Sequence, residues 1–157
     1  MKKILFVCTG NTCRSPMAEA MTVHRMPEAW KGAFAVSSAG TAACDGLKAA
    51  SNAIKVLEEI GIDLSGHRTR SLTREMLEEA DLVVALTGGH KEEILRRFSG
   101  SRGRVIVLGE LEGRRGNPDI ADPIGGDEEA YRVTREEISR LVPRLFDYLI
   151  EMYNITK

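Results

Sequence analysis

The chain has 157 residues, of which 43% are hydrophobic and 29% are charged, as in an ordinary globular domain with one core. Its formal net charge of −1 gives no general attraction to nucleic acid or to an anionic membrane. No apolar run is long enough to span a bilayer, and three cysteines do not suggest a secreted disulfide scaffold. We therefore expect a single cytoplasmic domain over residues 1–157, monomeric and without a nucleic-acid or membrane partner.

The first expected element is a short buried strand over residues 4–7, where an unbroken apolar run leaves no polar face. A loop follows, and then a helix over residues 17–24. Pro16 suits the first position of a helix, and Ser15 before it is a good N-cap. Such a strand–loop–helix turns backbone N–H groups inward at the positive end of a helix dipole, so the loop is suited to hold an anion.

Two side chains make this loop reactive. Cys8 opens it and Arg14 closes it, in the spacing Cys-x5-Arg. A ring of N–H donors favours the thiolate form of a cysteine, and Ser15 is placed to donate to its sulfur. The planar guanidinium of Arg14 fits two phosphoryl oxygens at once, as a lysine cannot. A thiolate that faces a clamped phosphate is a nucleophile directed at phosphorus.

Along the rest of the chain, apolar strands alternate with amphipathic helices. We expect strands over 34–39, 81–86 and 104–108, and helices over 46–61, after the N-cap Thr73, over 89–98 and over 127–153. The helix over 46–61 has an apolar stripe of Leu47, Ala50, Ile54, Leu57 and Ile60 and a Gly61 cap. The last helix has a stripe of Ile138, Leu141, Leu145 and Leu149, and should be kinked or interrupted near Pro143.

This alternation predicts an α/β fold whose parallel sheet is covered by helices on both faces. Ligands in such folds bind beyond the carboxyl ends of the strands, where Cys8 begins. A long loop over 109–126 lies at the same end of the sheet and contains two aspartates, Asp119 and Asp122. Phosphoryl transfer to sulfur leaves a group that needs a proton, and either carboxyl group is a possible acid.

The stretch from Val7 to Glu19, VCTGNTCRSPMAE, resembles the signature loop of the low-molecular-weight protein tyrosine phosphatases, a family that includes bacterial enzymes acting on phosphoarginine. The resemblance implies a three-layer sandwich with four parallel strands in the order 2-1-3-4, and hydrolysis of phosphorylated proteins through a cysteinyl-phosphate. It implies Cys8 as nucleophile and Arg14 as clamp, with phosphate also held by Thr9, Gly10, Asn11, Thr12, Cys13 and Ser15. No metal or other cofactor is expected, because the arginine and the backbone dipoles replace a cation.

The resemblance also bears on the acid and on the support of the loop. The family places its general acid in an Asp-Pro pair, which only Asp122 matches; Asp119 as the acid and Asp122 as a mere turn residue remain open. Asn11 is expected to shape the loop through a left-handed backbone. His67 matches a family histidine that supports this asparagine, although a solvent-facing histidine is equally compatible with the sequence. Ser38 is a possible loop-supporting donor.

Two features favour phosphoarginine as the substrate. Tyrosine-specific members usually have an aliphatic residue where this chain has Thr12, and aromatic residues after Asp-Pro, where this chain has the run 124–126, Ile-Gly-Gly. The arginine-phosphatase branch shares the threonine in the loop, the Gly-Gly after Asp-Pro, and a threonine with a downstream histidine like Thr87 and His90. Phosphotyrosine, on which most of the family acts, is the alternative.

The three cysteines and the phosphate-binding loop are also compatible with other chemistries. Cys13 is either a resolving thiol that forms a disulfide with Cys8 or a buried inert residue. A zinc site formed by Cys8 and Cys13 is not expected, because the sequence has no second pair of ligands at a suitable spacing. Arsenate reductases use a similar loop but need further cysteines near residues 81–98, where this chain has none, and Cys44 stands alone. An inactive phosphate-binding module would lack the nucleophile or the acid, and both are present.

Overall fold

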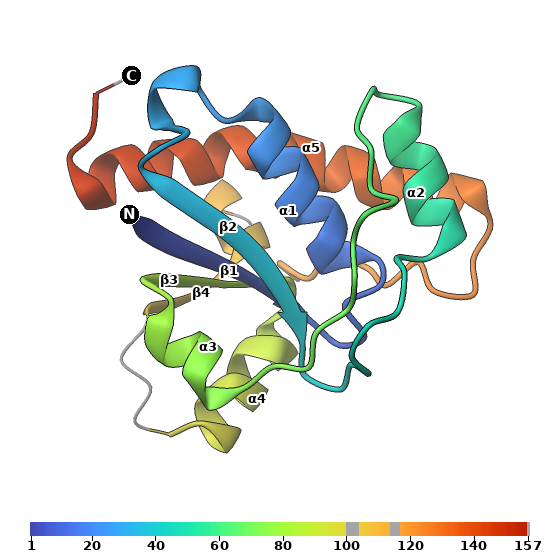
Figure 1. Ribbon diagram of the computed structural model, residues 1–157, viewed down its shortest axis with the longest axis horizontal. Coiled ribbons are helices and arrows are strands. Elements are labelled where there is room, and N and C mark those ends of the chain that lie inside the picture. The colour runs from blue at the N-terminus through green and yellow to red at the C-terminus, as the bar shows by residue number, and fades with distance from the viewer. Residues whose placement is uncertain (100–103, 114–116, 157) are drawn as a thin grey trace.

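Four parallel strands form the central sheet, in the spatial order β2-β1-β3-β4 (Figure 1). The computed structural model describes residues 1–99, 104–113 and 117–156. The strands are β1 (Lys2–Cys8), β2 (Phe34–Gly40), β3 (Leu82–Ala85) and β4 (Arg104–Val107). Their order and parallel pairing confirm the expected sheet. Cys8 pairs with Gly40 of β2 and Val7 pairs with Ala85 of β3, so these three strands end together.

Helices cover both faces of the sheet, which confirms the three-layer sandwich. They are α1 (Arg14–Arg25), α2 (Ser51–Glu58), α3 (Arg74–Glu79), α4 (Gly88–Arg97) and α5 (Glu128–Tyr153), with 3-10 turns at Glu28–Trp30 and Leu108–Glu112. Figure 1 shows α3 and α4 on one side and α1, α2 and α5 on the other. Successive residues of β1 alternate between the two cores: Phe6 packs with α1 and α5, and Val7 packs with α3 and α4.

The expected interruption of the last helix at Pro143 is wrong. α5 runs without a break from Glu128 to Tyr153, and its predicted apolar stripe is buried. A proline cannot bond the carbonyl four residues earlier, which here belongs to Ser139. That carbonyl instead accepts a hydrogen bond from Arg25 Nη1 on α1, at 2.9 Å. A side chain from another helix therefore satisfies the group that Pro143 leaves free.

The helix expected over 46–61 is also wrong in its first third, because α2 begins only at Ser51. The backbone before it bonds to distant segments instead of to itself. The N–H of Leu47 donates to the hydroxyl of Thr69, at 2.8 Å, and the N–H of Ala50 donates to the carbonyl of Thr12, at 2.9 Å. Leu47 is consequently 54% exposed and does not belong to an apolar stripe. The segment 46–50, which we call the strap, thus lies against the loop that follows β1.

The start of α1 differs from the expectation as well. The helix begins at Arg14, and its N-cap residue is Cys13, with no side-chain cap bond, so Ser15 is not the N-cap. The first N–H groups of the helix are therefore not occupied by a capping side chain. Elsewhere the expected elements agree within a few residues, and Thr73 caps α3 as predicted by accepting a bond from Met76 N, at 3.2 Å. In the loop expected over 109–126, residues 114–116 lie outside the described part of the chain.

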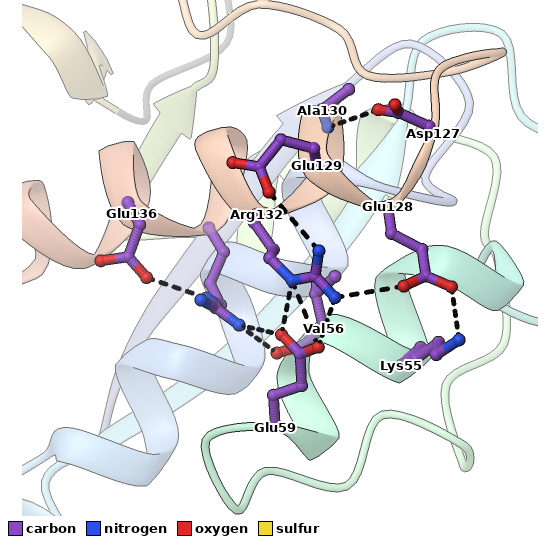
Figure 2. Close-up of polar contacts among 10 residues, drawn as sticks. Lys55, Val56, Glu59, Asp127, Glu128, Glu129, Ala130, Arg132 and Glu136 are labelled. Atoms are coloured by element: carbon purple, nitrogen blue, oxygen red, sulfur yellow. Dashed lines mark hydrogen bonds and ion pairs between the residues drawn. The ribbon is translucent and has the colours of Figure 1, made fainter.

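Ion pairs fasten α2 to the N-terminal half of α5 (Figure 2). Arg132 Nη2 lies 2.7 Å from a Glu59 carboxylate oxygen, and Arg135 Nη1 lies 2.7 Å from the other. Lys55 adds a bond to Glu128. The two guanidinium groups lower the pKa of Glu59 to about 2. These pairs are partly solvated and individually weak, but together they fix α2, and with it the strap that ends at Ala50. Within the described residues, no helix is both long and apolar enough to cross a membrane.

Candidate active site

Cys8 ends β1 with its sulfur directed into the loop that leads to α1. It is 3% exposed, and its Sγ lies 2.9 Å from Ser15 Oγ. The same serine oxygen accepts a hydrogen bond from Asn11 Nδ2, at 2.8 Å. Because that amide occupies a lone pair of the serine, the hydroxyl hydrogen is left for the sulfur. A hydroxyl group so placed can donate to the sulfur when it carries negative charge as a nucleophile or leaving group.

Asn11 holds the loop in shape from behind. Its φ of 57° is left-handed, as expected, and its side chain is completely buried. Nδ2 also donates to Ser38 Oγ at 2.9 Å, and Oδ1 accepts the N–H of Arg70 at 2.9 Å. Ser38 thus supports the loop as an acceptor in this contact, not as the donor that the sequence suggested. His67 Nε2 lies 2.8 Å from the Asn11 carbonyl oxygen, so His67 does contact this asparagine.

The loop's carbonyl groups bond outward, away from the sulfur. The carbonyl of Cys8 accepts from Thr41 N and that of Thr9 from Ala42 N, each at 2.9 Å. The carbonyl of Asn11 meets His67 and that of Thr12 meets Ala50. In a trans peptide the C=O and the following N–H point in opposite directions. The N–H groups of residues 9, 10, 12 and 13 are therefore turned inward, which produces the predicted anion cradle.

Gly40 allows this close contact between β2 and the loop. A Cβ at this position would lie 2.4 Å from the Thr9 carbonyl oxygen and 3.0 Å from Asn11 N. Both neighbours are backbone atoms, which cannot rotate aside as a side chain can. Only a glycine lets the end of β2 lie against the loop without displacing it.

Arg14 lies at the end of the loop, buried and doubly held. Its Nη1 donates to the Ile120 carbonyl at 2.9 Å, and its Nη2 lies 3.4 Å from Asp122 Oδ2. The arginine side chain is 8% exposed and that of Asp122 is 42% exposed. The contact between them brings the loop after β4 over the anion cradle. The guanidinium group is thereby oriented before any substrate arrives.

The two aspartates of that loop have different surroundings. Asp122 contacts Arg14, and its Oδ1 accepts the N–H of Ile124 at 3.1 Å. Asp119 Oδ1 instead accepts the N–H of Gly88, the first residue of α4, at 2.8 Å. Asp119 therefore joins the loop to α4, while Asp122 is the carboxylate that contacts the arginine and lines the same cavity as Cys8. The geometry favours Asp122 as the acid.

A cavity of about 110 Å³ opens over the sulfur. Its lining residues are Cys8, Thr9, Gly10, Thr12, Cys13, Arg14, Asp122 and Ile124. Most of the predicted site residues thus meet in one place, whereas Asn11 and Ser15 are fully buried and support the loop from behind. Larger hollows of about 410 and 450 Å³ run along residues 61–64, but the described residues that line them include no cysteine and no arginine.

Cys13 has inert surroundings. It is buried, and its Sγ lies 3.3 Å from the hydroxyl of Tyr131 on α5. Burial raises the pKa of the Cys13 thiol above its ordinary value. This favours the unreactive interpretation of Cys13, although both it and Cys8 are free cysteines that line the same cavity. No cluster of three or more metal-binding side chains occurs among the residues that the structure describes.

His90 is a site residue whose contacts the sequence did not reveal. It lies in the first turn of α4 and is 6% exposed. Its Nε2 is 2.8 Å from Thr9 Oγ1, and its Nδ1 is 3.0 Å from Thr87 Oγ1. The available signal was the pattern Thr-x-x-His directly after a strand next to β1 in a parallel sheet. Adjacent parallel strands end at the same edge, so this turn had to lie near the Cys8 loop.

Comparisons with known proteins agree with this geometry. The protein-arginine-phosphatase of Geobacillus stearothermophilus is 42% identical over 94% of this chain and 95% of its own length. The probable low molecular weight protein-tyrosine-phosphatase EpsP of Ralstonia nicotianae is 38% identical, covering 92% of this chain and 97% of its own. The structure of a YwlE arginine phosphatase mutant with a phosphorylated active-site serine superposes with a TM-score of 0.83, at 41% identity, over 94% of this chain and 95% of that one.

The family profile extends over almost the whole chain. The profile described as "Low molecular weight phosphotyrosine protein phosphatase" matches residues 3–154, which include the Cys8 loop, both aspartates and the helices α1 to α5. The fold, the Cys-x5-Arg loop and the relatives thus lead to one conclusion. The chain is a cysteine-dependent protein phosphatase and belongs to the low molecular weight phosphotyrosine protein phosphatase family.

Proposed function

We propose that this phosphatase removes phosphate from phosphoarginine in proteins in preference to phosphotyrosine. The observation that carries the proposal is the wall of the cavity over Cys8. Half-buried Thr12 gives it a hydroxyl group, and none of the described residues that line it is aromatic. Ile124, on the rim, is 66% exposed and cannot stack on a phenol ring as an aromatic side chain would. Tyr131, which contacts the lining residue Cys13 through its hydroxyl group, is buried behind it.

In the first step the Cys8 thiolate attacks phosphorus in line with the leaving nitrogen. The S–P bond forms as the P–N bond breaks, and the phosphoryl oxygens remain on the inward N–H groups and on Arg14. Asp122 gives its proton to the departing guanidine nitrogen. Since a guanidine is a strong base, the product leaves as a cation. The hydroxyl of Thr12 offers a hydrogen-bonding partner to the planar guanidine group.

In the second step a water molecule attacks the cysteinyl-phosphate. Asp122, now a carboxylate, accepts the proton of this water, while the S–P bond breaks and the thiolate is regenerated as phosphate leaves. The Ser15 hydroxyl, 2.9 Å from the sulfur, stabilises Cys8 as the leaving group of this step. Apart from the substrate, every group that takes part in the two steps belongs to the chain or to water.

The names of two relatives indicate different substrates. The relative at 42% identity is named a protein-arginine-phosphatase, whereas EpsP, at 38% identity, is named a probable protein-tyrosine-phosphatase. The difference between 42% and 38% identity is too small to choose between the two substrates. The second candidate function is therefore hydrolysis of phosphotyrosine, favoured by the family profile. The lining of the cavity is the reason for preferring phosphoarginine.

The test compares kcat/KM on two peptides of identical sequence that carry either phosphoarginine or phosphotyrosine. A generic aryl phosphate serves as the control for active enzyme. We expect the phosphoarginine peptide to be preferred by at least about tenfold, the discrimination given by a polar contact in a site built for it. Turnover of the aryl phosphate together with a preference for the phosphotyrosine peptide would assign the second function instead.

We also propose the remaining features that the sequence led us to expect. They are that residues 1–157 form one domain, that the protein acts as a monomer, and that it is cytoplasmic with phosphorylated proteins as its partners. A phosphorylated protein substrate is consistent with the shallow position of the cavity, because Thr9 and Ile124 on its rim are both exposed.

A further inference from the structure

His90 lies between two threonines that belong to different parts of the site. Thr87 caps α4 and accepts the backbone N–H of His90 at 3.1 Å, while Thr9 follows Cys8 directly in the loop. The imidazole ring joins the two hydroxyl groups, at 3.0 Å from Nδ1 and 2.8 Å from Nε2. Burial leaves only 6% of the residue exposed. A histidine that served only as a solvated surface residue would need neither of these hydrogen bonds.

The partners of the ring indicate which nitrogen carries the proton. Thr87 Oγ1 already accepts the N–H of His90, and its other contact in the described part of the chain is with Nδ1 of the same ring. We assign its hydroxyl hydrogen to Nδ1, since this leaves neither the hydroxyl hydrogen nor the ring lone pair without a partner. Nε2 then carries the ring hydrogen and donates it to Thr9 Oγ1.

This assignment determines how Thr9 presents its hydroxyl group. One lone pair of its oxygen is occupied by Nε2–H, so its own hydrogen is free to point elsewhere. Thr9 is exposed on the rim of the cavity over Cys8. We propose that His90 is a positioning residue for phosphoryl transfer, which holds Thr9 so that its hydroxyl donates to a bound phosphoryl oxygen.

The charge of the ring is consistent with this role. Burial, and after it the positive charge of Arg14, lower the pKa of His90 to about 4. The other charged groups that act on the ring are Glu93, Asp119 and Asp122, and they only partly oppose this effect. At neutral pH the ring is therefore an uncharged donor that does not compete with Arg14 for the phosphate.

The same turn of α4 is tied to the acid loop. Gly88, the first residue of α4, gives its N–H to Asp119, three residues before Asp122. The turn thus contacts both the cradle, through His90, and the loop that holds the acid, through Asp119. An altered His90 is expected to change phosphate binding first, because its direct partner is Thr9.

The test uses two substitutions that each retain one half of the ring. The amide of His90→Gln reaches the place of Nε2 and keeps the contact with Thr9, whereas the amide of His90→Asn reaches the place of Nδ1 and keeps only that with Thr87. We measure KM and kcat for p-nitrophenyl phosphate and the inhibition constant of inorganic phosphate, so that the result does not depend on the preferred phosphorylated residue. His24→Asn, at an exposed histidine of α1, is the matched control and should resemble wild type.

We expect His90→Asn to raise KM and the phosphate inhibition constant by about tenfold, the effect of one hydrogen bond to a charged group, and His90→Gln to stay within about threefold of wild type. Thr9→Val should match His90→Asn, and the double variant should lose little more than either alone. Rescue by Asn instead of Gln, or fully additive losses, would overturn the proposal and assign His90 to the stability of the α4 turn. Thermal unfolding of each variant identifies loss through misfolding, and Thr9→Val, at an exposed position, then decides the question alone.

Discussion

Arg14 Nη2 and Asp122 Oδ2 lie 3.4 Å apart in the wall of the cavity over Cys8, and the arginine is buried whereas the aspartate is partly solvated. Arg14 is held from the other side by the carbonyl of Ile120, so the same loop segment supplies both contacts. The guanidinium group that we propose to clamp phosphate therefore also holds the proposed acid, Asp122, in the site. Phosphate that binds Arg14 will lie next to Asp122, in reach of the leaving group.

Asp122→Ala tests the acid. We expect kcat for phenyl phosphate, whose leaving group needs a proton, to fall by about 10²- to 10⁴-fold. The loss for p-nitrophenyl phosphate should be much smaller, because nitrophenolate leaves without protonation. Asp119→Ala is the matched comparison: it removes the bond to Gly88 N, and should lower stability without changing the ratio between the two substrates. A larger change of that ratio for Asp119→Ala would make Asp119 the acid.

Cys8→Ser tests the nucleophile. The hydroxyl that replaces the thiol is not ionised at neutral pH, so turnover should be lost, while the inward N–H groups and Arg14 still bind phosphate. Arg14→Lys should also be severely impaired, because an ammonium group cannot contact two phosphoryl oxygens in one plane. Steady-state assays, with calorimetry of phosphate binding to Cys8→Ser, check both expectations. Activity of Cys8→Ser within tenfold of wild type would contradict covalent catalysis.

The sequence predicted the sheet because its signals are local: each strand is an apolar run, and each helix has its own periodicity. The errors arose where a distant segment decided the outcome. Ala50 bonds the loop at Thr12 instead of joining a helix, and the carbonyl that Pro143 frees is satisfied by Arg25. Neither partner is within 30 residues in the chain, so no local pattern reports it.

The site divides in the same way. Cys8, Arg14 and Asn11 could be identified because the motif holds them within a few residues of one another. The contact of His90 with Thr9 spans 81 positions in the sequence, and became visible only with the fold. The need for a glycine at position 40 was equally hidden, since it follows from the approach of two backbone segments.

Gly40→Ala tests that approach. The added methyl group would meet the Thr9 carbonyl oxygen at 2.4 Å, so the end of β2 and the loop must separate. We expect a loss of about 1–3 kcal/mol in the free energy of unfolding, the usual cost of overpacking, together with a lower kcat/KM. Gly32→Ala is the control, because nothing lies within 4 Å of a Cβ there. Urea unfolding measures the free energy of unfolding of both variants. Equal values for the two would refute the close contact.

The neutral state of His90 predicts a pH dependence of stability. Its pKa is about 4 in the folded chain, against an ordinary 6.5, so between these values the unfolded chain binds more protons. Stability should therefore fall as pH drops from 6.5 to 4, by on the order of 3 kcal/mol in full. Glu59, with a folded pKa of about 2, contributes stability that is lost only below about pH 4.5. Urea unfolding of wild type and His90→Asn at pH 7 and pH 4 isolates the histidine, and an equal loss in both would contradict the assignment.

Thr12→Ile tests the basis of the substrate preference. Thr12 lines the cavity with its hydroxyl 3.6 Å from Cys13 Sγ, and isoleucine exchanges that hydroxyl for apolar bulk on the same β-branched frame. A site built to hydrogen-bond its substrate loses most when the polar partner is removed, so kcat/KM for a phosphoarginine peptide should drop by at least tenfold. The matched phosphotyrosine peptide needs no such bond, and an apolar wall suits its ring, so its kcat/KM should stay the same or rise. Thr12→Val, which removes the hydroxyl at nearly constant volume, separates the two causes: if the loss comes from the hydrogen bond, valine reproduces it, and if it comes from bulk, valine resembles wild type. An unchanged ratio between the two peptides in both variants would mean that another part of the cavity, and not Thr12, selects the phosphorylated side chain.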